Sequence, residues 1–272
     1  MLRVGLIGFG TIGRAVADAL CRGDVDGAAL AAVFVRSRAP GTRLRVRPDD
    51  PAAYGDLFHD GFAAFAGAGL DWAVEAGGHE ALRQWGPRAL AAGINLVALS
   101  VGALADTAFC DDLVAAARAA SRRVLVPSGG IGTLDVLSSA AVGRLDEVRL
   151  TTRKPPRALL PPEEAARVVA SGRAELLYDG PAGEAARRFP ENLNICAALA
   201  LAGVGLDRTR VTVYADPEVE RNTHRVTARG YFGDYEFTLR NVPSENPKTG
   251  RIVALSVVKT LRNLTRPLVV GG

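Results

Sequence analysis

The sequence opens with an apolar segment that runs directly into a glycine-rich loop. Residues 2–7 are apolar enough for a buried strand, Gly8-Phe9-Gly10-Thr11-Ile12-Gly13 follows, and residues 11–22 have helical spacing. In a G-x-G-x-x-G loop, the first glycine permits a tight turn, the second lets the backbone approach a pyrophosphate, and the third allows close helix–strand packing. The order strand, loop and helix therefore predicts a Rossmann unit whose helix N-terminus binds a dinucleotide. The alternative is an ordinary glycine-rich turn.

Strand and helix patterns alternate over the first 128 residues. Such alternation predicts a parallel, doubly wound sheet. Asp106 is placed to cap one of the helices, and the Pro-, Gly- and Arg-rich residues 37–51 read as a loop. The expected strands are residues 2–7, 29–36, 70–75, 95–101 and 124–126, and the expected helices are 11–22, 80–92 and 107–120.

The pattern changes after residue 128. Three strands in quick succession predict a mixed or antiparallel sheet with helices on one face. The fold class is therefore α/β, with an N-terminal Rossmann domain (residues 1–128 and 245–272) and a second α+β domain (129–244) for substrate, catalysis and oligomerisation. The expected strands are 147–152, 210–214, 225–231 and 235–240, and the expected helices are 133–142, 162–170, 183–188, 192–202 and 249–264. Ile252, Leu255, Val258 and Leu261 recur at helical spacing, so we expect the last helix to pack on the first domain.

The end of the second predicted strand bears on the choice of cofactor. An acidic residue there would bind the ribose 2′-hydroxyl of NAD, but this chain has Arg36-Ser37-Arg38. Guanidinium groups suit a 2′-phosphate. We therefore expect NADP to bind at least as well as NAD, with Arg36 as a cofactor contact. The alternative is that these arginines point into water.

Composition excludes several classes of protein. The 33 basic residues include only three lysines (Lys154, Lys248 and Lys259), and the arginines are spread along the chain without a block. The sequence has no nucleic-acid motif, and its net charge of +4 favours anionic small ligands. The three cysteines have neither metal-site nor disulfide spacing. The apolar runs are too short to span a membrane and no signal peptide precedes the first strand, so we expect a cytoplasmic protein.

Several segments together resemble the L-aspartate dehydrogenase family. They occur in the family's order and are spread over almost the whole chain. They are residues 100–106, 126–135, 152–156, 189–195, 215–217 with 222–224, and 242–249.

The resemblance implies oxidation of L-aspartate, or another small dicarboxylate, to its imine with NAD or NADP. It implies a catalytic His224 and cofactor contacts from Gly130 and Asn194, in addition to Gly8, Gly10, Thr11, Ile12 and Gly13 of the loop. The family often has Ala at the position of Gly130; because that contact is through the backbone, we expect little change. We further expect a homodimer that takes part in NAD biosynthesis, although aspartate catabolism fits equally well.

His224 is the best placed of the three histidines, because it follows the strand that ends at residues 215–217 and leads into the next strand, where loops carry function. A histidine of near-neutral pKa can take a proton from the water that attacks an imine. An exposed loop histidine is the alternative. Asp216 would orient His224 or bind elsewhere, Asn192 would cap a helix or contact the cofactor, and Lys154 would pair with a substrate carboxylate if it lies in the cleft. Two other functions stay open: a reductase related to dihydrodipicolinate reductase or homoserine dehydrogenase, and a non-catalytic NAD(P)-binding sensor.

Overall fold

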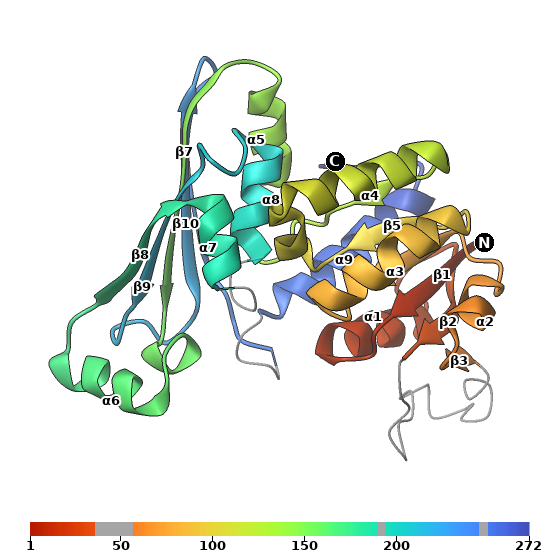
Figure 1. Cartoon of the computed structure of the whole chain (residues 1–272), viewed down its shortest axis with the longest axis horizontal. Helices are drawn as coiled ribbons and strands as arrows, with labels where there is room; N and C mark the ends of the chain where they lie inside the picture. The colour runs from red at the N-terminus through yellow and green to blue at the C-terminus, as the bar shows by residue number, and fades with distance from the viewer. Residues whose placement is uncertain (36–56, 190–193, 245–249, 272) are drawn as a thin grey trace. The chain divides into compact units, whose positions relative to one another are not determined.

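The computed structural model describes residues 1–35, 57–189, 194–244 and 250–271. The chain divides into two compact units, one made of Met1–Pro127 and Ala254–Gly272 and the other of Ser128–Val253. Each unit has its own sheet (Figure 1). None of the helices that the structure describes combines the length and apolar content of a membrane-spanning segment.

The sheet of the first unit is parallel throughout, in the order β3-β2-β1-β4-β5-β6. The central strand β1 has β2 on one side and β4 on the other, so the strand order reverses there. A crevice for a ligand forms where such neighbouring strands end at a reversal. The strands are β1 (Leu2–Ile7), β2 (Ala28–Phe34), β3 (Phe58–His59), β4 (Trp72–Glu75), β5 (Asn95–Ala98) and β6 (Val124–Leu125).

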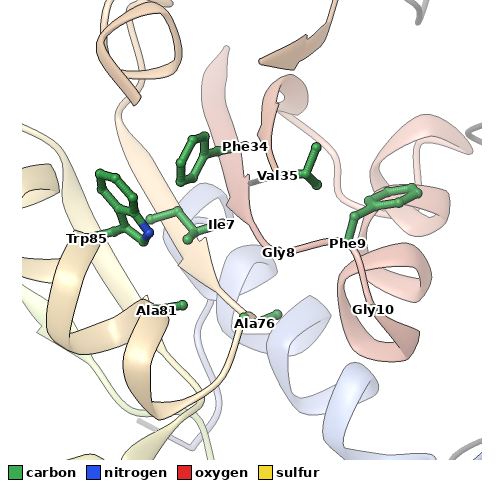
Figure 2. Close-up of a pocket in the computed structure, with 10 residues that line it drawn as sticks. Ile7, Gly8, Phe9, Gly10, Phe34, Val35, Ala76, Ala81 and Trp85 are labelled. Carbon is green, nitrogen blue, oxygen red and sulfur yellow. The ribbon is translucent and has the colours of Figure 1, made fainter. Parts of the chain in front are cut away.

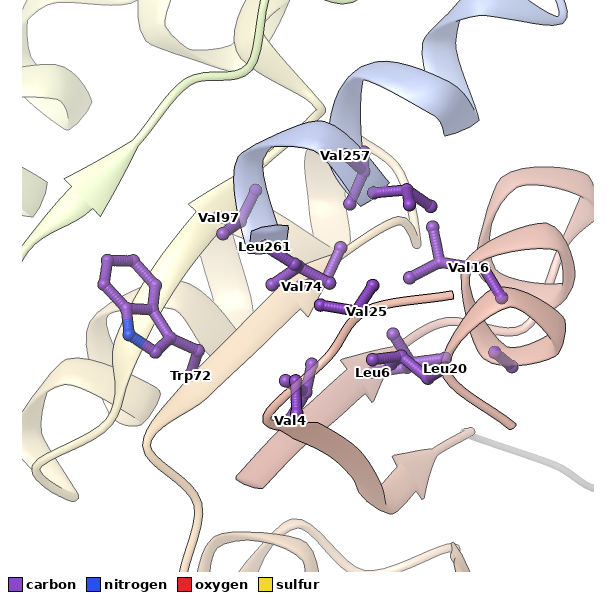
Figure 3. Packing of buried hydrophobic residues seen from close by; sticks show 14 of the residues in the cluster. Val4, Leu6, Val16, Leu20, Val25, Trp72, Val74, Val97, Val257 and Leu261 are labelled. Atoms are coloured by element: carbon purple, nitrogen blue, oxygen red, sulfur yellow. The ribbon is translucent and has the colours of Figure 1, made fainter. Parts of the chain in front are cut away.

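Helices cover both faces of this sheet, as a doubly wound fold requires. On one face, Val4 and Leu6 of β1 pack with Val16 of α1 and Leu261 of α9 (Figure 3). On the other face, α3 and α4 meet β5 around Gly86. The helices are α1 (Thr11–Cys21), α2 (Phe62–Ala66), α3 (His79–Ala91), α4 (Thr107–Ala119) and α9 (Ile252–Thr265), with a 3₁₀ turn at Val101–Ala105.

The last helix returns to the first unit, as its sequence pattern predicts. Val257, Val258 and Leu261 of α9 are buried in the core of the parallel sheet. The prediction that Ile252 and Leu255 share this packing is wrong, because both are exposed. The buried face of α9 is therefore narrower than the spacing of its apolar residues predicts.

The second unit holds a mixed five-stranded sheet in the order β11-β10-β7-β9-β8. β7 and β9 are parallel, and the other neighbours are antiparallel. The prediction of an α/β fold with a Rossmann sheet and a second mixed sheet is therefore confirmed. The strands are β7 (Leu145–Lys154), β8 (Glu175–Pro181), β9 (Arg210–Ala215), β10 (Thr223–Gly230) and β11 (Gly233–Arg240).

One face of this sheet is covered by helices, and the strand sequences show which side chains reach it. Along β7, Val148, Leu150, Thr152 and Lys154 are buried, and the residues between them are more exposed. This is the period of two expected for a half-covered strand. The helices of the unit are α5 (Leu134–Ala141), α6 (Pro162–Ser171), α7 (Ala182–Arg188) and α8 (Asn194–Ala202), with a 3₁₀ turn at Pro156–Ala158. Figure 1 shows α5, α7 and α8 on the same side of the sheet.

Candidate active site

The first unit has a groove at the carboxyl ends of β1, β2 and β4, with a volume of about 350 Å³. A groove of this volume can hold part of an organic ligand. Figure 2 shows Gly8 and Gly10 at one side, with Phe34 and Trp85 at another. The lining residues are Ile7, Gly8, Phe9, Gly10, Phe34, Val35, Ala76, Gly77, Ala81 and Trp85.

The glycine loop lies between β1 and α1, where the sequence predicts it. Gly8 has φ of +96°, and a Cβ there would lie 2.7 Å from the Cα of Gly77. A Cβ on Gly13 would lie 2.5 Å from the carbonyl oxygen of Gly8. A Cβ on Gly10 would meet nothing within 4 Å. Close packing thus explains why Gly8 and Gly13 are glycines. Gly10, in contrast, leaves open space at the N-terminus of α1, next to Thr11 and Ile12.

Open space at Gly10 fits a ligand that approaches the backbone closely. Gly10 is the N-cap residue of α1 and supplies no side-chain cap. The first N–H groups of a helix have no partner within the helix, and they lie at the positive end of its dipole. The loop therefore has the geometry and the charge to hold a pyrophosphate.

Glu75 joins the two loops that follow β4 and β5. Its Oε1 accepts hydrogen bonds from the backbone N–H groups of Gly77 and Gly78 at 2.8 and 3.0 Å. Its carboxylate also accepts from the N–H and the hydroxyl of Ser100 at 3.0 and 2.9 Å. Burial raises the pKa of Glu75, and these hydrogen bonds oppose the rise. Sequence reasoning missed this residue, although a lone carboxylate ending an apolar strand before Gly77-Gly78 was a usable signal.

An aromatic cluster forms the apolar end of the groove. Phe34 at the end of β2 meets Trp85 of α3 edge to face, with ring centroids 4.8 Å apart. Sequence reasoning did not single out either residue. Arg36, Ser37 and Arg38 follow β2 but lie outside the described residues, so their predicted contact with a 2′-phosphate stays a prediction.

His224 lies in the second unit, on β10, with its side chain on the covered face of the sheet. It pairs directly with Thr152 of β7. The hydroxyl oxygen of Thr152 lies 3.1 Å from His224 Nδ1. The ring is only 4% exposed. The alternative of an exposed loop histidine is therefore wrong.

Buried polar side chains surround the end of β7 and the start of β10. Lys154 is two residues after Thr152, and Asn222 is two residues before His224. The N–H of Asn241 donates to the carbonyl of Asn222 at 2.8 Å. We call these five residues the polar cluster: Thr152, Lys154, Asn222, His224 and Asn241, all buried. So many buried polar groups at one point of a sheet mark a candidate site.

The environment of His224 changes its protonation. Burial, and then the positive charge of Lys154, lower the pKa of His224 from 6.5 to about 3. Both effects disfavour the imidazolium. The prediction that His224 has a near-neutral pKa is wrong for this structure. The ring is therefore neutral at physiological pH, and one nitrogen has a lone pair that can accept a proton.

Gly130 and Asn194, the other predicted cofactor contacts, also lie in the second unit. The Asn241 side chain donates to the carbonyl of Gly130 at 3.1 Å, which links the loop at Gly130 to the polar cluster. A Cβ on Gly130 would meet Asn241, Ile195 and Val253 at 3.5–3.8 Å, which are ordinary contacts, so Ala would fit. Asn194 is the first residue of α8. Asn192 lies outside the described residues.

The carboxylate of Asp216 contacts Arg153 and Glu218 and does not orient His224. Its Oδ2 pairs with Arg153 at 2.7 Å, and its Oδ1 accepts from the N–H of Glu218 at 2.9 Å. Cys196 is buried, and burial raises the pKa of its thiol to about 12, which excludes a reactive thiolate there. Among the described residues, no group of three or more His, Cys, Asp or Glu side chains is arranged to hold a metal ion.

Comparison with known proteins identifies the family. Residues 135–264 match the model "Aspartate dehydrogenase, C-terminal", and residues 8–127 match "Homoserine dehydrogenase, NAD binding domain". The L-aspartate dehydrogenase of Ralstonia pickettii is 40% identical over 97% of both chains. The chain belongs to the L-aspartate dehydrogenase family. The L-aspartate dehydrogenase of Pseudomonas aeruginosa is 46% identical over 73% of this chain and 75% of its own.

The fold agrees with this assignment. The crystal structure of aspartate dehydrogenase from Thermotoga maritima superposes with a TM-score of 0.75 at 28% identity, covering 100% of both chains. The resemblance to the L-aspartate dehydrogenase family, stated from short segments, is confirmed over the full length. The polar cluster lies within the part of the chain that matches the family's C-terminal model. The family assignment therefore favours a dehydrogenase over the alternative reductases.

Proposed function

We propose that this chain catalyses the NAD(P)-dependent oxidation of L-aspartate to iminoaspartate, which water converts to oxaloacetate and ammonia. The observation that carries the proposal is the buried, neutral His224 beside Thr152 and Lys154, in a segment that matches the aspartate dehydrogenase family. Neutral imidazole is the form that can act as a base.

The first unit supplies the cofactor site in this proposal. When bound, the nicotinamide cofactor accepts the hydride that leaves the α-carbon of the substrate. Gly10 and the N–H groups of Thr11 and Ile12 at the start of α1 hold the pyrophosphate, in a cofactor loop whose shape depends on Gly8 and Gly13. In the second unit, Gly130 and Asn194 provide further contacts to the cofactor. Arg36 contacts the 2′-phosphate of NADP.

The second unit supplies the base. Hydrolysis of an imine needs a water molecule to lose a proton as its oxygen adds to the imine carbon. If Nδ1 of His224 donates its hydrogen to the Thr152 hydroxyl, Nε2 presents a lone pair. His224 then takes the proton of the attacking water at Nε2, and it returns that proton as the amine leaves.

The test measures reduced-nicotinamide absorbance with a panel of amino acids and both cofactors. L-aspartate should give the largest kcat/KM. His224→Ala should lower kcat by about 10²–10⁴ without changing the affinity for NAD(P)H. Binding of NAD(P)H without turnover of any amino acid would overturn the proposal in favour of a non-catalytic sensor.

The cellular setting is part of the same proposal. We take the protein to be a cytoplasmic homodimer that supplies iminoaspartate for NAD biosynthesis, with aspartate catabolism as the alternative pathway. The full-length similarity to L-aspartate dehydrogenases supports the reaction on which both pathways depend. Light scattering coupled to size-exclusion chromatography would test the dimer, and a monomeric mass at micromolar concentration would exclude it.

A further inference from the structure

We propose that Glu75 is a positioning residue for the nicotinamide half of the cofactor. Its carboxylate holds the backbone at Gly77 and Ser100, where the chain leaves β4 and β5. The inference rests on the proposed binding of the cofactor's pyrophosphate at Gly10 and the start of α1. Glu75 is fully buried and does not line the groove, so it acts through the residues that it holds.

Glu75 is the last residue of β4, and the other residues of this strand are buried apolar side chains. A carboxylate among such neighbours has a large desolvation cost unless hydrogen bonds satisfy it. It accepts two hydrogen bonds from the N–H groups of Gly77 and Gly78 and two from Ser100. A carboxylate has about four acceptor positions, so these contacts satisfy it. In return, it fixes the backbone of its three partners.

Gly77 connects Glu75 to the groove. It lines the groove together with Gly8, and a Cβ on Gly8 would lie 2.8 Å from the nitrogen of Gly77. The same nitrogen donates its hydrogen to Oε1 of Glu75 at 2.8 Å. The β4 side of the groove therefore keeps its place through the carboxylate of Glu75.

The β2 side of the groove is held by a different contact. The N–H of Gly8 donates to the carbonyl oxygen of Phe34, at the end of β2, at 2.9 Å. This hydrogen bond joins two backbones and does not involve Glu75. Replacing Glu75 should therefore disturb the β4 side of the groove and leave the β2 side in place.

Ser100 extends the influence of Glu75 to the next strand. It lies two residues after the end of β5 and directly before the 3₁₀ turn at Val101–Ala105. Its N–H and its hydroxyl both donate to Glu75, at 3.0 and 2.9 Å, and its side chain is buried. One carboxylate therefore joins the segments that follow β4 and β5.

These two strands serve one half of a dinucleotide. In a doubly wound sheet, the dinucleotide lies across the point at which the strand order reverses, and the residue after β2 meets the adenosine ribose. The reversal in this chain is at β1, with β2 on one side and β4 and β5 on the other. The β4 side therefore serves the nicotinamide half, which accepts the hydride.

The experiment removes an acceptor from this position and keeps the shape of the side chain. Glu75→Gln is nearly isosteric, but its NH2 group cannot accept from an N–H group. Asp71→Asn is the matched control, because Asp71 precedes the same strand at its other end and also accepts a backbone N–H, from Arg3 at 2.7 Å. Leu261→Ala controls for lost stability, since Leu261 is a core residue that does not line the groove.

The ligands are NADH and AMP, which has the adenosine half alone. Fluorescence titration gives the Kd for NADH, and displacement of NADH gives the Kd for AMP, at a temperature at which each variant is folded. Glu75→Gln should raise the Kd for NADH about ten- to a hundredfold, the effect of one or two charge-assisted hydrogen bonds. It should change the Kd for AMP by less than about threefold. Asp71→Asn and Leu261→Ala should bind both ligands with the wild-type affinity.

Ser100→Ala is a milder second variant, because it removes only the hydroxyl that donates to Glu75. It should raise the Kd for NADH about three- to tenfold and leave the Kd for AMP unchanged. If Glu75→Gln gives no cooperative thermal transition, this variant decides. The wild-type Kd for NADH in Ser100→Ala would then exclude a positioning role.

Two outcomes for a folded Glu75→Gln protein would overturn the inference. The wild-type affinity for NADH would show that Glu75 contributes to stability alone. Equal losses for NADH and AMP would show a general distortion of the first unit, without preference for the nicotinamide half. Failure of the proposed function is distinguishable, because a wild-type protein that binds NADH without oxidising L-aspartate would refute that function and leave this binding test intact.

Discussion

The hydroxyl oxygen of Thr152 lies 3.1 Å from Nδ1 of His224, and the two residues face each other directly across β7 and β10. A hydrogen bond to one ring nitrogen holds the orientation of an imidazole, and the hydroxyl of Thr152 can accept from Nδ1 or donate to it. The strand register thus decides which imidazole nitrogen contacts Thr152 and which nitrogen does not. The nitrogen that contacts Thr152 is Nδ1, and Nε2 is the base in the proposed reaction.

We therefore expect Thr152→Val to lower kcat about three- to tenfold, because an isosteric side chain removes one hydrogen bond and leaves the packing in place. KM for L-aspartate should change little. Thr151→Val is the matched control, since Thr151 is the next residue on β7 and its side chain points to the opposite face. Equal losses of kcat in both variants would show that the effect is not specific to the Thr152–His224 contact.

The lowered pKa of His224 predicts a pH dependence of stability. Above its ordinary pKa of 6.5, the ring is neutral in both the folded and the unfolded chain, so it contributes nothing. Between pH 6.5 and about 3, the unfolded chain binds a proton at this ring that the folded chain does not. The free energy of unfolding should fall with decreasing pH in this window, by at most about 1.4 kcal/mol per pH unit from this group.

Denaturant unfolding of wild-type protein and His224→Gln at several pH values would measure this effect. The difference between the two free energies of unfolding isolates the histidine, because the other titrating groups are common to both. A difference that does not change from pH 7 to pH 4 would show that His224 is not kept neutral by the fold.

The glycines of the loop should separate into two classes. Gly13→Ala should destabilise the first unit by about 1–3 kcal/mol, because its Cβ would overlap the carbonyl oxygen of Gly8. Gly10→Ala should fold normally, since its backbone is extended and its Cβ would meet nothing within 4 Å. Its methyl group should instead weaken NAD(P)H binding by about tenfold or more, the cost of one charge-assisted hydrogen bond.

Thermal unfolding and NAD(P)H fluorescence titration of both variants would check these expectations. A Gly10→Ala protein with the wild-type cofactor affinity would mean that the pyrophosphate does not approach this position.

The contribution of α9 to the stability of the first unit can be measured by comparing a buried and an exposed leucine of this helix. Leu261 is fully buried and Leu255 is 60% exposed. Leu261→Ala should lower the free energy of unfolding by about 2–5 kcal/mol, and Leu255→Ala should change it by no more than about 0.5 kcal/mol. Urea unfolding followed by circular dichroism would give both values. Equal effects would contradict the burial pattern of this helix.

Arg36 and Arg38 provide the test of cofactor preference. Replacing both with Ala should weaken NADP binding much more than NAD binding, by about ten- to a hundredfold, because a 2′-phosphate would lose its guanidinium partners. The test compares the Kd values of NADH and NADPH, measured by fluorescence, between the wild-type protein and the double variant. A similar loss for both cofactors would remove these arginines from the 2′-phosphate site.

Much of the fold was predictable because its signals are local. The glycine loop, the strand–helix alternation and the N-cap at Asp106, which accepts from the N–H of Phe109, all depend on residues near one another in the sequence. β8 was missed because Glu175–Pro181 is an edge strand without clear alternation and ends in Asp-Gly-Pro. The predicted strand at 95–101 stops at Ala98, since Ser100 turns to bond Glu75.

The candidate site was only partly predictable, because its properties depend on residues that are far apart in the sequence. His224 was identified from a family segment, but its pKa depends on burial and on Lys154, 70 positions earlier in the sequence. The alternating pattern of β7 indicates that Thr152 and Lys154 share a face, but not that β10 is the neighbouring strand. Strand order and register come from long-range packing, which a single sequence does not specify.

The return of α9 to the first unit constrains the order in which the chain can fold during synthesis. Val257 and Leu261 complete a core whose other members, such as Val4 and Leu6, are translated before the second unit. The nucleotide-binding unit must therefore wait, with apolar surface uncovered, until the whole of the second unit has been translated. The second unit, whose residues are contiguous, is free to fold first. The unit that contains His224 can therefore fold during translation before the unit that contains the glycine loop.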